Sequence, residues 1–234
     1  MMYQDQTIQY EGSAAERSVL RNVYTWMALG LAITGVVAMY VASNPALMRA
    51  ILSNTVLFFG LIIAQLALVF TLSSRVQTMS PTSATMAFAV YSVLNGLTLS
   101  VIFVIYTGAS IAQAFFVAAG TFGALSLYAV TTKRDLGGLG QYLFAGLIGL
   151  ILAVVINSFV RSSSIDLIIS LFGVVLFMGL TAYDTQIIKS WARQMGPNAD
   201  EATYMRVSIM GALRLYLDFI NLFLYLLRFL GRRN

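Results

Sequence analysis

Long apolar runs separated by short polar connections make up most of this 234-residue chain. A helix needs about 20 apolar residues to cross the ~30 Å hydrocarbon core of a bilayer. Seven runs reach that length, which predicts an all-α integral membrane protein with seven transmembrane helices. The runs lie near residues 23–42, 54–73, 83–106, 110–130, 142–160, 165–188 and 208–230.

The connections leave little material for a second domain. We therefore expect one seven-helix transmembrane domain over 23–230, between a polar N-terminal tail (1–22) and a short basic C-terminal tail (231–234). Asn44-Pro45 and Ser80-Pro81 are breaks of the kind that end one helix and begin another.

The composition narrows the classes of function. Hydrophobic residues make up 59% of the chain and charged residues 10%, and there is no histidine or cysteine. That excludes disulfides, thiolate nucleophiles, imidazole bases and the usual zinc ligand sets. The net charge of +5 is spread over loops and ends rather than clustered, which argues against nucleic acid as a partner. We expect no enzyme and no bound cofactor.

The distribution of lysine and arginine predicts orientation, because cytoplasmic loops carry an excess of both. With the N-terminus in the cytoplasm, eight of these residues fall on the inside and five on the outside. The inside set is Arg17, Arg21, Arg75, Lys133, Arg134, Lys189, Arg193 and Arg206, and the outside set is Arg49, Arg161, Arg228, Arg232 and Arg233. The count favours a cytoplasmic N-terminus, although the basic C-terminal end argues the other way.

Small residues also recur at a spacing that lets helices approach closely in lipid. The pairs are Ala28 with Ala32, Gly120 with Ala124, and Ala145 with Gly149. We interpret them as helix-packing positions.

Two aspartates, Asp184 and Asp218, lie inside the last two apolar runs. An ionisable group in hydrocarbon costs on the order of 3 kcal/mol even on mild insertion scales, so such groups face a partner, a bundle interior or a water-filled path. With the N-terminus inside, both aspartates fall in the cytoplasmic half of the membrane. Paired there, they would share a proton and titrate as one unit, and their deprotonation would create a place for a hard cation that prefers oxygen ligands.

The last run has a polar stripe, because its polar residues recur at intervals of three and four. They are Gly211, Arg214, Asp218, Asn221, Tyr225 and Arg228. Interhelical hydrogen bonding alone would account for Asn221 and Tyr225, but poorly for Asp218. Elsewhere, Gln65 and Asn95 could line a path, although each alone fits a packing contact better.

Three segments of the sequence are characteristic of a known protein family. They are Gly179–Gln186 (GLTAYDTQ), Leu215–Phe223 (LYLDFINLF) and Ser126–Leu136 (SLYAVTTKRDL). Through them the chain resembles, over essentially its whole length, the Bax-inhibitor family, and most closely its bacterial inner-membrane branch.

The resemblance implies a seven-helix fold whose last helix is central and wrapped by the other six. It also implies a pH-sensitive calcium leak channel in the inner membrane, gated by a proton-sharing aspartate pair at Asp184 and Asp218, with calcium as permeant or weakly bound ligand. Some members are described as regulators of cell death or modulators of membrane-bound proteases.

The sequence departs from the family pattern at two places. Arg214 lies one turn before Asp218, where it would favour the ionised carboxylate. Some members carry an arginine in the second helix that latches the pair, and the second span here has only Gln65. Asn221, Tyr183 and Thr181 are further candidates to modulate the pair.

Two other functions compete with the leak. An intramembrane aspartyl protease would use a Tyr-Asp pair, which Tyr183-Asp184 provides, but its second aspartate follows Gly-x-Gly, whereas Leu215-Tyr216-Leu217 precedes Asp218. A non-conducting regulator that binds membrane proteases or other membrane proteins is the stronger alternative. Conduction by the purified protein separates it from the leak.

Overall fold

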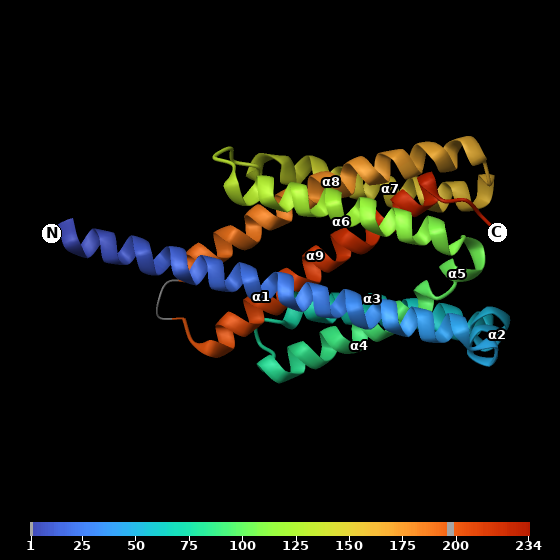
Figure 1. The fold of residues 1–234 in the computed structure, drawn as a ribbon, viewed down its shortest axis with the longest axis horizontal. Coiled ribbons are helices and arrows are strands. Elements are labelled where there is room, and N and C mark those ends of the chain that lie inside the picture. The colour runs from blue at the N-terminus through green and yellow to red at the C-terminus, as the bar shows by residue number, and fades with distance from the viewer. Residues whose placement is uncertain (1, 196–198) are drawn as a thin grey trace. The chain divides into compact units, whose positions relative to one another are not determined.

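The computed structural model describes residues 2–195 and 199–234, with side chains from residue 16 onward, and these residues are almost entirely helical (Figure 1). A single β-bridge joins Tyr106 and Arg233. The helices are α1 (Met2–Ser43), α2 (Pro45–Ser53), α3 (Thr55–Arg75), α4 (Pro81–Leu99), α5 (Ile102–Ile105), α6 (Gly108–Thr131), the 3₁₀ turn η1 (Gly137–Leu139), α7 (Gly140–Val160), α8 (Ser163–Gln194) and α9 (Glu201–Leu230).

Seven helical segments of the described residues are long and apolar enough to cross a membrane. This confirms the predicted all-α membrane fold. In α9, 72% of the most apolar 18-residue window is buried, against 6% in α3, so α9 is the helix most enclosed by protein.

Side-chain caps fix the helix starts predicted from Asn-Pro and Ser-Pro. The Asn44 Oδ1 atom accepts hydrogen bonds from the backbone nitrogens of Ala46 (3.1 Å) and Leu47 (3.2 Å). The Ser80 hydroxyl caps α4 in the same way, and a proline occupies the first helical position in both cases. These contacts satisfy backbone donors that the first turn of a helix leaves without a partner, and proline has no such donor to lose.

The N-terminal segment and one connection differ from what the sequence pattern suggested. Residues 2–22, expected as a polar tail, are helical and continuous with the first span, because α1 runs from Met2 to Ser43. Helix propagation costs little once a span has formed, so helix-forming residues ahead of it continue it.

The polar connection expected from Lys189 to Arg206 is also shorter than predicted. Helix α8 continues to Gln194, and α9 already begins at Glu201. Glu16 of α1 explains the extension, because its carboxylate pairs with Arg193 (2.8 Å) and Lys189 (3.8 Å) of α8. Gly196-Pro197-Asn198, expected at the middle of the connection, lies outside the described residues.

The chain divides into two compact units, and α8 and α9 contribute to both. Unit 1 contains Met1–Ile105 and Ile188–Tyr216, and unit 2 contains Tyr106–Ile187 and Leu217–Asn234.

Unit 1 is organised around a buried polar contact in its core. The Thr34 hydroxyl donates to the Ser92 carbonyl (2.9 Å) and lies 2.6 Å from the Tyr216 hydroxyl. A threonine has one hydroxyl proton, so Tyr216 is the donor to Thr34. The Tyr216 ring also meets Phe88 and Tyr91 edge-on, at centroid distances of 5.7 and 5.6 Å. The first half of α9 is thereby fixed to α1 and α4.

In unit 2, ring contacts hold the second half of α9. Phe219 packs edge-on against Phe115 and Phe122 of α6, with centroids 5.6 Å apart in both cases. Tyr225 stacks on Phe177 of α8 at 5.8 Å, and its ring lies directly over Gly173.

The C-terminal end of unit 2 is held by charge and backbone contacts. Arg228 forms an ion pair with Asp166, and Arg233 lies 3.9 Å from the same carboxylate. The Thr107 nitrogen donates to the Arg232 carbonyl (3.2 Å), and the Arg232 nitrogen donates to the Ser110 hydroxyl (2.9 Å). Two of the basic residues that argued against an external C-terminus therefore have an acidic partner within the fold.

The three predicted small-residue pairs are wrong as packing positions within this chain. Their residues are exposed, and a Cβ atom added at Gly120 or Gly149 would meet nothing within 4 Å. Other glycines make the close approaches, such as Gly96, where an added Cβ would lie 2.8 Å from the Thr34 carbonyl oxygen. Spacing alone does not tell which face of a helix meets a neighbour and which meets lipid.

Replacing Gly173 by alanine should destabilise unit 2. The added Cβ would lie 2.6 Å from the Tyr225 ring, so the ring must move and its stacking on Phe177 is disturbed. Overpacking of this kind costs about 1–3 kcal/mol. The control is Gly123→Ala in α6, where an added Cβ meets nothing within 4 Å. Unfolding in mixed micelles measures both variants, and equal loss of stability in the two would contradict the packing of Tyr225 on Gly173.

Candidate functional site

The two aspartates predicted to matter are both buried in unit 2, on α8 and α9. Asp184 exposes 8% of its surface and Asp218 4%. On α8, Asp184 belongs to a buried stretch with Thr181, Ala182 and Thr185. On α9, several apolar neighbours of Asp218 are buried as well, including Tyr216, Phe219 and Leu222. These positions of α9 therefore face protein rather than lipid.

The contacts of unit 2 fix the relative direction of the two helices that carry the aspartates. Asp166 near the start of α8 pairs with Arg228 near the end of α9, and Phe177 stacks on Tyr225, so the two helices run antiparallel. Asp184 lies seven residues beyond Phe177, and Asp218 lies seven residues before Tyr225. At ~1.5 Å of rise per residue, both aspartates lie about 10 Å from that stacked pair, in the same direction.

The neighbours named as modulators have identified roles in unit 2. The Thr181 hydroxyl donates to the Phe177 carbonyl (2.7 Å), and the Asn221 side chain donates to the Leu217 carbonyl (2.8 Å). Tyr183 packs on Gly140 of α7, where an added Cβ would lie 2.5 Å from its hydroxyl oxygen. The two hydrogen bonds stay within their own helices, and the Tyr183 contact packs α8 against α7.

Gln186, the last residue of the GLTAYDTQ segment, ties a loop to α8. Its Oε1 atom accepts from the Leu136 nitrogen (2.6 Å), and its Nε2 atom donates to the Arg134 carbonyl (2.8 Å). Two of the three segments that carried the family resemblance are thus joined by hydrogen bonds.

The predicted path-lining residues belong to unit 1, and their amides bond within it. The Gln65 amide nitrogen lies within hydrogen-bond distance of the Thr98 hydroxyl (3.2 Å) and the Leu94 carbonyl (3.3 Å). The Asn95 amide donates to the Tyr91 hydroxyl (3.0 Å). These hydrogen bonds fit the packing role that the sequence favoured for each residue taken alone. A role in lining an ion path stays a prediction.

Arg214 also belongs to unit 1. Its guanidinium lies over the Trp191 ring, 5.1 Å from the ring centroid, which is a cation–π geometry. Its effect on Asp218, four residues further along α9, stays a prediction.

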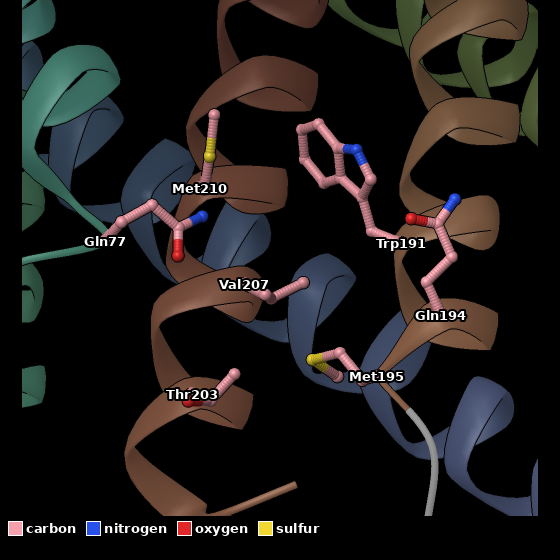
Figure 2. A pocket seen from close by; sticks show the side chains of 7 residues that line it. All are labelled: Gln77, Trp191, Gln194, Met195, Thr203, Val207 and Met210. Carbon is pink, nitrogen blue, oxygen red and sulfur yellow. The ribbon is translucent and has the colours of Figure 1, made fainter.

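Unit 1 contains a cavity of about 350 Å³ that the sequence did not indicate. Figure 2 shows its lining side chains on the last turns of α8 and the first turns of α9, with Gln77 on the connection after α3. They are Gln77, Trp191, Gln194, Met195, Thr203, Val207 and Met210. Amides, thioethers and an indole provide no ionised group, which suits an uncharged, partly apolar molecule better than an ion.

The described residues contain no cluster of three or more acidic, histidine or cysteine side chains that could hold a metal ion. A calcium site at Asp184 and Asp218 would need oxygen atoms other than carboxylates, because Ca²⁺ takes six to eight oxygen ligands. The sequence did not suggest which residues these are.

Two buried hydroxyls of unit 2 were missed by the sequence reasoning. The Ser126 and Thr185 oxygens have no hydrogen-bond partner in the described structure, although both side chains are buried. Serine and threonine are common in membrane helices, so residue type alone gave no signal.

Comparison with known proteins agrees with the resemblance seen in the sequence. A family model described as "Inhibitor of apoptosis-promoting Bax1" matches residues 16–234. The inner membrane protein YbhL of Escherichia coli K12 is 50% identical over 221 residues, covering 94% of each chain. Uncharacterized proteins of Borreliella burgdorferi (42% identical, 98% of each chain) and Deinococcus radiodurans (44%, covering 93% of this chain and 92% of the relative) are also similar. The chain belongs to the Bax-inhibitor family of membrane proteins.

Proposed function

We propose that this protein is a passive calcium leak of the bacterial inner membrane, made sensitive to pH by Asp184 and Asp218. One observation carries the proposal: two carboxylates are buried in unit 2, within apolar spans of antiparallel helices. Buried ionisable groups in a membrane are costly, and ion or proton pathways are the usual reason for them. The name of the 50% identical relative, an inner membrane protein, supports the location.

The pair would act by exchanging a proton for a cation. When it holds a proton, one carboxylate donates to the other and the site presents little charge. When the proton leaves, two negative charges repel one another and attract a hard cation with oxygen ligands. Two carboxylates with few other ligands bind Ca²⁺ weakly, which suits passage because a conducted ion must also leave its site.

We place the N-terminus in the cytoplasm, as the lysine and arginine count favours. The opposing argument was the basic C-terminal end. Arg228 and Arg233 both contact Asp166, so these two charges have a structural role on either side of the membrane. The basic C-terminal end is therefore a weaker argument for a cytoplasmic C-terminus.

Calcium flux through liposomes that contain only the purified protein tests the proposal. The wild-type flux should change with pH, and Asp184→Asn and Asp218→Asn should each flatten that pH dependence, because an amide cannot release a proton. Asp135→Asn is the matched control: Asp135 is an exposed carboxylate of the same unit, and asparagine can keep its bond to the Gly137 nitrogen. Folded protein without flux at any pH would refute the leak and favour the regulator that binds membrane proteases.

Arg214 should set the pH at which the leak responds. A cation one turn from Asp218 favours the ionised carboxylate, so its removal makes the proton harder to lose. Arg214→Gln should therefore move the midpoint of the flux profile to higher pH. Arg214→Lys, which keeps the charge, should stay close to wild type. An unchanged midpoint in Arg214→Gln would show that this arginine does not act on the pair.

A further inference from the structure

Buried serine and threonine hydroxyls of the described residues mostly have a hydrogen-bond partner. Nine buried serines and threonines occur among the described residues: Thr34, Ser92, Ser100, Ser110, Ser126, Ser170, Thr181, Thr185 and Ser208. Seven of these hydroxyls are hydrogen-bonded, four of them through donation to a carbonyl of the preceding turn of their own helix. Ser126 and Thr185 are the two exceptions.

These exceptions are unusual because a helix offers every serine and threonine a nearby acceptor. Ser170 and Thr181, on the same helix as Thr185, donate to the carbonyls of Asp166 and Phe177, both at 2.7 Å. A buried hydroxyl that makes no such bond has lost its contacts with water and gained none within the protein. Such a group calls for an explanation.

Both hydroxyls belong to unit 2, one directly after Asp184 in the sequence and one on the helix that packs against the residue after Asp218. Thr185 directly follows Asp184 on α8 and is fully buried with it. On α6, Ser126 continues a buried stripe through Ala118 and Phe122, and Phe122 packs against Phe219, the residue after Asp218. Ser126 lies one turn beyond Phe122 on the same face. The parts of α6, α8 and α9 that belong to unit 2 thus each contribute at least one of these oxygen atoms.

We propose that Ser126 Oγ and Thr185 Oγ1 are neutral oxygen ligands for the Ca²⁺ ion held by Asp184 and Asp218. This deepens the proposed function and rests on it. Two ionised carboxylates balance the charge of Ca²⁺ but fall short of the six to eight oxygen ligands it takes. A hydroxyl has lone pairs to offer and adds no charge, so it raises the ligand number while the attraction stays moderate. Water and backbone carbonyls can complete the shell.

The test compares Ser126→Ala and Thr185→Val with wild type at a fixed pH where the leak is active. The calcium concentration that gives half-maximal flux should rise roughly tenfold in each variant, the scale on which metal sites respond to lost supporting groups. The midpoint of the pH dependence should stay near that of wild type, because both carboxylates remain. The control is Ser170→Ala, a buried hydroxyl of α8 that already donates within its helix, and it should leave the half-maximal concentration unchanged.

Stability separates a ligand role from a structural one. Since neither hydroxyl bonds to the described protein, Ser126→Ala and Thr185→Val should unfold at the same temperature as wild type or higher, while binding calcium more weakly. Loss of stability together with unchanged calcium dependence would overturn the proposal and make the hydroxyls packing groups.

Terbium luminescence with the detergent-purified protein distinguishes failure of this site from failure of the leak. Terbium binds oxygen ligands as calcium does, and calcium should displace it. Binding that is weakened in both hydroxyl variants supports the site even if the liposomes show no flux. Flux and binding that both stay at wild-type levels in the variants overturn the hydroxyl ligands and leave the leak in place. Absence of terbium or calcium binding to the wild type overturns the site.

Discussion

The cost of placing a carboxylate in hydrocarbon is the constraint on which this structure depends. Asp184 and Asp218 lie in spans that would otherwise suit lipid on every side, so the protein must enclose them. It does so by burying α9 along most of its length, whereas α3 stays almost entirely exposed. The aromatic contacts of Phe219 and Tyr225, together with the ion pair of Arg228, then hold the second half of α9 in register with α6 and α8.

Because Asp184 and Asp218 lie inside spanning helices, the polar atoms around them come from helices rather than from loops. Backbone groups inside a bilayer must bond within their own segment, which leaves side chains as the main source of polar atoms. In unit 2 they include the buried carboxylates of Asp184 and Asp218. They also include the hydroxyls of Ser126 and Thr185, for which the described protein offers no hydrogen-bond partner. The proposed weak calcium site would draw its ligands from these oxygen atoms.

The sequence predicted the parts of the structure that depend on local pattern. Apolar run lengths located the seven spans, and Asn44-Pro45 and Ser80-Pro81 located two helix starts, because these signals act within a few residues. It failed where the answer depends on which face of a helix meets a neighbour. Gly120 and Gly149 have the expected spacing but face away from other helices of the chain, while Gly173 packs under a tyrosine ring. The hydroxyls of Ser126 and Thr185 could not be singled out, because their lack of a partner is a property of packing alone.

Competition between protons and calcium at the aspartate pair tests the account most directly. In lightly buffered detergent solution, near the pH at which the leak responds, calcium added to the wild-type protein should release protons, because the ion binds the deprotonated pair. Asp184→Asn and Asp218→Asn should abolish most of that release. Calcium binding without proton release, or release that persists in both variants, would contradict a pair that exchanges a proton for a cation.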